Sequence, residues 1–182
     1  MSKKNFLKMF RNSKPIMGML HLKGTYDEKI LERALLETGV YVQNGIDAVI
    51  VEDYYGDVYN VEEVLQYLKA TRKDLKIGVN ILNRYEKTFE IAKQFNVDFV
   101  QLDSVAGHLE LAADKNFEQK LNDLREESDV FVLGGVRFKY QQYLSGRTLE
   151  EDLRAGMNRC DAIVVTGSRT GVETDLAKIR KF

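Results

Sequence analysis

Two residues at the ends of apolar runs have side chains that could transfer protons. Glu52 ends the run "AVIVE", and His21 lies near the end of "PIMGMLHL". Burial can adjust the proton affinity of such a carboxylate to the working pH, and an imidazole changes its charge near neutral pH. We therefore predict that Glu52 and His21 are catalytic acid–base groups. The structural alternatives are an ion pair of Glu52 with a nearby cation and a hydrogen-bonded core histidine.

Further polar residues follow the other apolar runs and are predicted to bind a substrate: Asn80, Gln101, Asp103, Arg137, Lys139, Thr166 and Ser168. Arg137 and Lys139 are two positions apart, so both can face one side of a strand, where their charges suit a phosphate or carboxylate. Asn80 can both donate to and accept from a substrate hydroxyl. The predicted ligand is therefore a small anionic or sugar-like metabolite. The alternatives for Arg137 and Lys139 are a solvated loop start or pairing with Glu52 and Asp103. The alternative for Asn80 is an amide that joins two strands.

The sequence offers few ligands for a metal ion. Two His and one Cys are too few for the usual zinc sites. Two carboxylates from separate strands, Glu52 and Asp103, are weak evidence for a metal, so we predict no metal ligands and assign no cofactor. The segment "TGSRTG" (166–171) has neither the P-loop pattern nor the dinucleotide fingerprint, but its amides and hydroxyls could hold an anion.

These candidate residues must be positioned by the elements that precede them. Six apolar runs rich in Val and Ile occur at 15–22, 47–53, 75–82, 97–103, 130–138 and 161–167. Such runs are typical of parallel strands that are buried on both faces, and amphipathic helical patterns lie between them. The sequence therefore predicts an α/β chain of about six βα units. Both an open doubly wound sheet and a TIM-barrel-like repeat fit this pattern.

Local signals mark where these elements start. Two pairs have the spacing of a capping box, Thr25 with Glu28 and Thr148 with Glu151. Three looser versions are Asn60 with Glu63, Asn83 with Glu86, and Asn116 with Gln119. An Asp stands just before or at the start of three of the apolar runs, at positions 47, 98 and 161. We expect each pair to begin a helix, and the repeated Asp supports a βα repeat.

The composition limits the classes of function. The chain has 182 residues, 44% of them hydrophobic, and a formal net charge of -1. These values suit one globular domain spanning 1–182 and give no general attraction to nucleic acid. No apolar run approaches the roughly 18 residues of a membrane span. A single Cys160 cannot form an internal disulfide, which fits a cytoplasmic protein.

The N-terminal lead-in segment 1–14 combines basic and aromatic residues. It contains "NFLKMF", in which Phe6, Leu7, Met9 and Phe10 lie close together. Such a segment can form a short helix that covers the bottom of a barrel, or it can make a peripheral contact with a membrane surface. At this length the covering helix is the preferred interpretation.

Four blocks of the sequence resemble the BtpA family, which also includes SgcQ-type proteins. The blocks are "KPIMGMLHLKG" (14–24), "GIDAVIVEDYYGD" (45–57), "GVNIL" (78–82) and "DAIVVTGSRTG" (161–171). They occur in order along almost the whole chain. The resemblance implies a TIM-barrel-like fold, and the cyanobacterial member of the family is associated with accumulation of photosystem I. Such sequences are also distantly similar to phosphoribosylanthranilate isomerase, a phosphate-binding barrel.

The resemblance leaves several hypotheses open. One is an enzyme of isomerase or lyase type that acts on a phosphorylated or sugar-like metabolite. Another is a non-catalytic biogenesis factor for a membrane complex, with "EDYYGDVYN" (52–60) as its partner surface. The family pattern also implies two further βα units, so we expect a barrel truncated at its C-terminus. The first and sixth strands would then have open edges that favour self-association. An inactive partial barrel is the third hypothesis.

Overall fold

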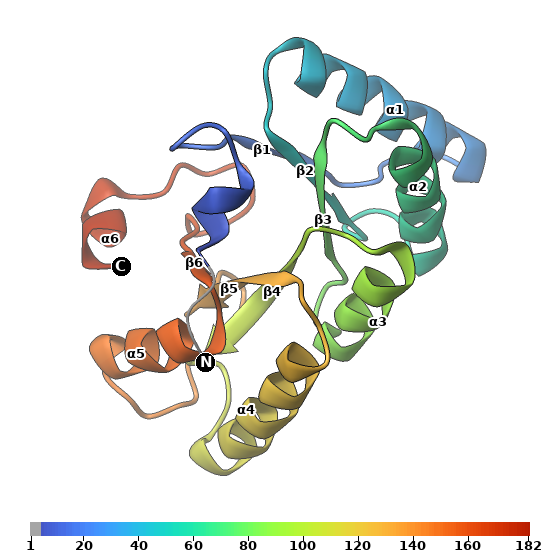
Figure 1. The fold of residues 1–182 in the computed structure, drawn as a ribbon. Helices are drawn as coiled ribbons and strands as arrows, with labels where there is room; N and C mark the ends of the chain where they lie inside the picture. The colour runs from blue at the N-terminus through green and yellow to red at the C-terminus, as the bar shows by residue number, and fades with distance from the viewer. Residues whose placement is uncertain (1–4) are drawn as a thin grey trace. The chain divides into compact units, whose positions relative to one another are not determined.

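The computed structural model describes residues 5–182, in which strands and helices alternate along the chain (Figure 1). The strands are β1 (Met17–Leu20), β2 (Ala48–Glu52), β3 (Lys76–Asn80), β4 (Phe99–Ala106), β5 (Phe131–Val136) and β6 (Ala162–Val164). The helices are α1 (Asp27–Gln43), α2 (Val58–Thr71), α3 (Tyr85–Phe95), α4 (Leu111–Glu126), α5 (Leu149–Arg159) and α6 (Leu176–Lys181), preceded by the 3-10 helix η1 (Phe6–Met9). Each of the six predicted strands is confirmed. The fourth continues three residues beyond its predicted end.

The order of the strands decides between the two architectures that the sequence left open. The strands are parallel, and each is hydrogen-bonded to its neighbour in sequence, in the order β1-β2-β3-β4-β5-β6. A doubly wound sheet reverses its order at a switch point, whereas a barrel keeps the order of the sequence. The fold is therefore TIM-barrel-like, with six βα units.

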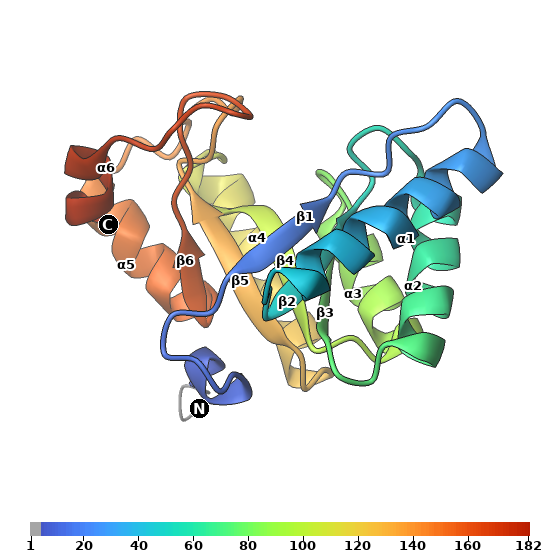
Figure 2. The same ribbon diagram turned by 90° about the horizontal axis from the view of Figure 1, so that it is seen from above.

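The chain divides into two compact units, and the boundary lies inside β4. The first unit comprises residues 5–101, and the described part of the second comprises residues 102–182. In the first unit, α1 packs on β1, α2 on β2 and α3 on β3. These three helices form a row, because α2 also packs against both α1 and α3 (Figures 1 and 2). The strand β2 is buried along its whole length, as predicted for a strand covered on both faces.

In the second unit, α5 packs on β5 and β6, and α4 packs against α5. Two adjacent glycines in β5 make this packing possible. A Cβ on Gly134 would lie 2.6 Å from Val105 and 3.0 Å from Cys160, and a Cβ on Gly135 would lie 2.0 Å from the carbonyl oxygen of Asp103. The space beside both glycines is therefore filled by the protein itself.

Three aspartates join successive strands at their starts. Asp47 accepts a hydrogen bond from the amide of Ile16 at 2.8 Å, and its own amide donates to the carbonyl of Ile16 at 2.9 Å. The same two-way contact links Asp98 to Ile77 and Asp161 to Val132. Each aspartate thus pairs the strand that it begins with the preceding strand. The Asp repeat in the sequence marks this contact.

The predicted helix starts are only partly confirmed. Thr148 and Glu151 form the capping box at the start of α5. For α2, the box is made by Asp57 and Asn60, one turn earlier than the predicted pair of Asn60 with Glu63. The predicted box of Thr25 with Glu28 is wrong, because α1 begins after Tyr26, which makes no side-chain cap. An acidic first turn of Asp27 and Glu28 favours the start of α1 instead.

The lead-in segment is anchored by one aromatic side chain. Phe6 in η1 is 6% exposed and packs edge-on against Phe99 at the start of β4, with ring centres 5.6 Å apart. Leu7 remains 49% exposed. The described part of the segment therefore covers the N-terminal end of a strand, as the preferred interpretation states. Residues 1–4 of the segment lie outside the described residues.

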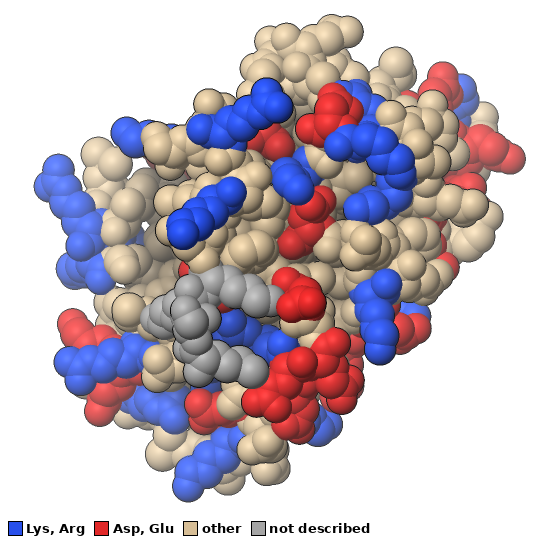
Figure 3. All heavy atoms as spheres, in the orientation of Figure 1, with Lys and Arg blue, Asp and Glu red and all other residues tan. Residues whose placement is uncertain are grey.

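Acidic and basic side chains are interspersed on the molecular face drawn in Figure 3, in keeping with a net charge of -1. Among residues 5–182, no helix is both long enough and apolar enough to cross a membrane.

The Asp161 contact gives the first testable prediction. We expect Asp161→Ala to lower the free energy of unfolding by about 1–3 kcal/mol, because it leaves the amide of Val132 without its acceptor. The change also removes the ion pair with Arg125, in which the aspartate side chain is 3% exposed. Urea unfolding of the full chain measures the effect. The matched control is Glu90→Ala, whose exposed pair with Lys87 should contribute little. Equal stability of the two variants would contradict the prediction.

Candidate functional site

Three predicted site residues meet at the C-terminal ends of β1, β2 and β3, all within the first unit. Glu52 is the last residue of β2 and Asn80 the last of β3, and the strand register places them opposite each other. Asn80 donates through Nδ2 to Glu52 Oε2 at 2.7 Å. His21 directly follows β1, and its Nε2 lies 3.4 Å from Glu52 Oε1. The structure thus forms a His21–Glu52–Asn80 group.

Burial distinguishes the members of this group. The side chain of Glu52 is 7% exposed, whereas that of His21 is 34% exposed. A buried carboxylate next to an imidazole orients the ring and stabilises the cation that forms when the ring takes a proton. His21 is therefore the member that a molecule from solvent can reach. Glu52 contacts the imidazole, and Asn80 holds the Glu52 carboxylate by a hydrogen bond.

The strand end also separates Glu52 from its neighbour Asp53. Successive side chains of a strand point to opposite sides. Asp53 accepts hydrogen bonds from the Leu82 amide at 2.8 Å and from Arg84 at 2.9 Å. These contacts hold the start of the loop after β3. Glu52 and Asp53 consequently have different roles, as the alternation of strand side chains predicts.

Two tyrosines that follow Glu52 form an aromatic wall beside His21. The ring centres of Tyr54 and Tyr55 lie 5.0 and 6.4 Å from that of His21, and 4.8 Å from each other. The amide of Tyr55 donates to the carbonyl of His21 at 3.0 Å, so the two loops are held together. Sequence reasoning treated these tyrosines only as a partner surface. Their position directly after a strand-end carboxylate was the signal that could have placed them here.

The remaining predicted residues make other contacts, and all of them except Gln101 belong to the second unit. Gln101 is 8% exposed within β4 and ends the first unit. Asp103 is the second residue of the β4 segment in the second unit and is 9% exposed. Its neighbour Ser104 donates to Gln141 in the loop after β5. Nothing in these contacts singles out a ligand for Gln101 or Asp103, and their roles remain predictions.

Arg137 and Lys139 have different partners within the second unit. Arg137 has φ 49°, and its side chain pairs with Asp152 at 2.8 Å and donates to the carbonyl of Arg147 at 2.6 Å. Its partner is therefore neither Glu52 nor Asp103. Lys139 donates to Thr170 Oγ1 at 3.1 Å. Arg137 is thus paired with a carboxylate, whereas Lys139 donates to a hydroxyl.

The loop after β6 contains the last two predicted residues. The carbonyl of Thr166 accepts a hydrogen bond from Lys178 at 2.8 Å, and Ser168 is exposed. The amide of Thr170 donates to the hydroxyl of Tyr140, and this contact lowers the pKa of the tyrosine. Lys139, Tyr140 and the loop 166–170 therefore lie together, as a possible anion site would require.

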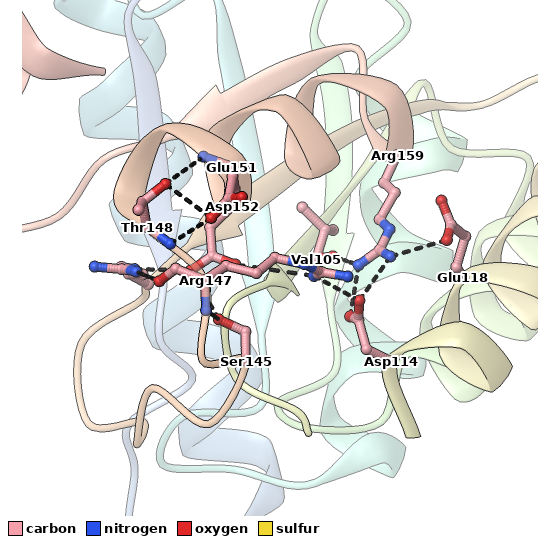
Figure 4. A network of polar contacts seen from close by, with 10 residues as sticks. Val105, Asp114, Glu118, Ser145, Arg147, Thr148, Glu151, Asp152 and Arg159 are labelled. Atoms are coloured by element: carbon pink, nitrogen blue, oxygen red, sulfur yellow. Dashed lines mark hydrogen bonds and ion pairs between the residues drawn. The ribbon is translucent and has the colours of Figure 1, made fainter. Parts of the chain in front are cut away.

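A buried ion network, which the sequence analysis missed, supports the loops of the second unit (Figure 4). Arg159 is 1% exposed and makes two hydrogen bonds to Asp114, at 2.7 and 2.9 Å. Arg147 also binds Asp114, at 2.7 Å. Burial alone would raise the pKa of Asp114, but the hydrogen bonds from Arg159 and Arg147 hold it below its usual value. Arg159 also donates to the carbonyl of Val105, which ties α5 to β4.

A fully buried arginine has no sequence signature of its own, because a charged residue is normally taken to be exposed. The network is structural: its members bind one another and the backbone. Among residues 5–182, no group of three or more His, Cys, Asp or Glu side chains is arranged to hold a metal ion.

His108 lies next to this network and gives a pH prediction. Burial is the main reason that its pKa is lowered from 6.5, and its ring packs edge-on against Phe117. As the pH falls below about 6.5, the unfolded chain binds a proton that the folded chain resists. We therefore expect the free energy of unfolding to fall with decreasing pH, by at most about 1.4 kcal/mol per pH unit from this group.

Urea unfolding between pH 8 and pH 5 measures this slope. His108→Phe keeps the aromatic contact but cannot titrate, so its slope should be shallower than that of the wild type. His21 is present in both chains and cancels in the comparison. Identical slopes would contradict the prediction.

Sequence comparison with known protein families identifies one family that includes this chain. The model of the BtpA family matches residues 12–182. This chain belongs to the BtpA family. The match confirms the resemblance carried by the four sequence blocks. Uncharacterised relatives from Pyrococcus horikoshii and Methanocaldococcus jannaschii are 28% and 26% identical, over 92% and 94% of this chain. The aligned region covers 73% and 74% of those two BtpA-related proteins.

Solved structures show the fold of this BtpA-family chain. The crystal structure of 7,8-dihydropteroate synthase from Vibrio fischeri is 15% identical, with a TM-score of 0.54 over 88% of this chain. A dihydropteroate synthase from Xanthomonas albilineans is also 15% identical, with a TM-score of 0.49 over 67% of the chain. This chain spans 63% and 44% of the two synthases. At such identity the first likeness supports the TIM-barrel-like fold alone.

Proposed function

We propose that this protein is an enzyme that transfers protons to and from a small polar metabolite through His21 and Glu52. The observation that carries the proposal is the 3.4 Å approach of His21 Nε2 to the buried Glu52 carboxylate. In TIM-barrel enzymes the reacting groups lie at the C-terminal ends of the strands, and this pair lies there. Isomerisation and elimination are the reaction classes that such a pair can serve.

The three residues have separable roles in this reaction. His21 takes a proton from the substrate and returns it, because its ring is the exposed member of the group. Glu52 stabilises the protonated ring, and Asn80 fixes the Glu52 carboxylate through the 2.7 Å hydrogen bond. Tyr54 and Tyr55 limit the space beside the imidazole. The space that these two rings leave beside His21 therefore suits a small substrate of a few carbon atoms.

Proton exchange with solvent tests this function. The full chain is incubated in D₂O with short sugar phosphates and polyhydroxy acids, and the loss of C–H signals is followed by proton NMR. We expect Glu52→Gln to slow the exchange by about 10²–10⁴-fold, since the neutral amide cannot stabilise the imidazolium. The melting temperature should stay close to that of the wild type.

Glu90→Gln on the exposed surface of α3 is the matched control, and it should leave the exchange rate unchanged. Exchange that is equally fast in Glu52→Gln would show that another group transfers the proton. Absence of exchange with the whole panel would remove the support for a substrate of this class.

A second candidate function is a non-catalytic biogenesis factor for a membrane complex. Its support is the exposure of two aromatic side chains, Tyr55 at 58% and Tyr59 at 57%. Exposed aromatic residues are enriched in protein interfaces. Tyr59 lies in the first turn of α2 and belongs neither to the His21–Glu52–Asn80 group nor to the aromatic wall of Tyr54 and Tyr55.

Complementation of a gene deletion discriminates between the two functions. If the protein is an enzyme, Glu52→Gln should fail to complement while Tyr59→Ser succeeds. The reverse result, with normal complementation by Glu52→Gln and loss of the membrane complex with Tyr59→Ser, would support the biogenesis factor. Western blotting of both variants confirms that the chains accumulate equally.

A further inference from the structure

An open cavity of about 520 Å³ lies beside the loop that leads from β1 into α1. All of its lining residues are exposed, so it is an open hollow in the surface that can hold one end of a small ligand. Three of the lining side chains are cations, Lys23, Lys29 and Arg33, and one is a carboxylate, Glu32. Three positive charges against one negative charge leave the lining with a net charge of +2. The cavity is therefore suited to an anion.

The three cations differ in how they are paired. Lys29 lies 2.5 Å from Glu32, and Arg33 donates through Nε to Glu37 at 2.7 Å. A guanidinium has five N–H donors, so this bond uses only a part of Arg33. Lys23 has no carboxylate within 4 Å among residues 5–182 and lies 5.2 Å from the centre of the Tyr55 ring. Lys23 is consequently the cation most available to a ligand.

Lys23 also connects the cavity to the proposed catalytic group. It is two residues beyond His21, and the Tyr55 ring beneath it lies 6.4 Å from the imidazole, centre to centre. The backbone bond from Tyr55 to His21 holds these loops in place. A small ligand whose reacting part contacts His21 can therefore extend along Tyr55 and place an anionic group among the cations.

We propose that this cavity binds the phosphate of a small phosphate monoester, whose remaining part is the substrate of His21 and Glu52. The identification of that molecule as the substrate rests on the function proposed above, whereas the phosphate site rests on the cavity alone. A phosphate monoester carries a charge of about −1.5 to −2 at pH 7 and three strong acceptor oxygens. A carboxylate has a smaller charge and only two oxygens with which to bind Lys23 and Arg33.

Binding of inorganic phosphate to the full chain tests the site. Isothermal titration calorimetry at low ionic strength compares the wild type with Lys23→Gln, with the double variant Lys23→Gln/Arg33→Gln, and with Lys93→Gln. Lys93 is exposed on α3 outside the cavity, so its variant loses the same charge elsewhere. We expect the Kd to rise about tenfold or more in the double variant, and to change less than about twofold in Lys93→Gln, because distant exposed charges are screened.

Glu32→Gln gives a prediction of opposite sign. This variant removes the carboxylate from the lining, so we expect it to lower the Kd for phosphate about two- to fivefold. A gain in affinity cannot result from partial unfolding. Equal weakening by Lys93→Gln and the double variant would overturn the site. Acetate that binds as tightly as phosphate would overturn the assignment to a phosphate monoester.

Glu52→Gln makes failure of the site distinguishable from failure of the proposed enzyme. Phosphate binding that persists in Glu52→Gln and is lost in the cavity variants supports the site, whether or not proton exchange is found. If the cavity variants bind phosphate normally while proton exchange still requires Glu52, the site is refuted and the proposed enzyme stands.

Discussion

The contact on which the structure depends most is the pairing of an aspartate at a strand start with the backbone of the preceding strand. Asp47, Asp98 and Asp161 each accept a hydrogen bond from that strand and return one from their own amide. A slip of one residue in a strand pair would turn every side chain to the opposite face. By setting the register of β1 with β2, of β3 with β4 and of β5 with β6, these contacts also determine which side chains of each pair meet at the other end.

The proposed site lies at the other end of these strands. The Asp47 contact sets the register of β1 and β2, and His21 reaches the Glu52 carboxylate from the end of β1. Glu52 also stands opposite Asn80 in the separate pairing of β2 with β3. One residue further along, Asp53 faces the other side and binds the next loop. The neighbouring carboxylates thus have different partners: Glu52 contacts His21 and Asn80, whereas Asp53 contacts the loop after β3. The strand geometry makes that separation without further contacts.

The second unit stabilises its loops by a different means. Its loops are held by the buried network of Arg159, Asp114 and Arg147, together with the pair of Arg137 and Asp152. Burying charges is costly unless each is paired and hydrogen-bonded, and here each of these charges has an opposite partner. The network gives the loops after β4 and β5 a defined conformation, and Arg137 contributes through its ion pair with Asp152. Lys139 instead donates a hydrogen bond to Thr170 in the loop after β6.

The sequence by itself determined the six βα units, the capping box of α5, the Asp repeat and the strand-end positions of Glu52, His21 and Asn80, because periodicity and spacing are local properties. Only the tertiary structure decided the strand order, the 3.4 Å approach of His21 to Glu52, and the aromatic wall of Tyr54 and Tyr55. It also revealed that Arg159 is buried. These features depend on contacts between residues far apart in the chain, where local pattern carries no information about the partner.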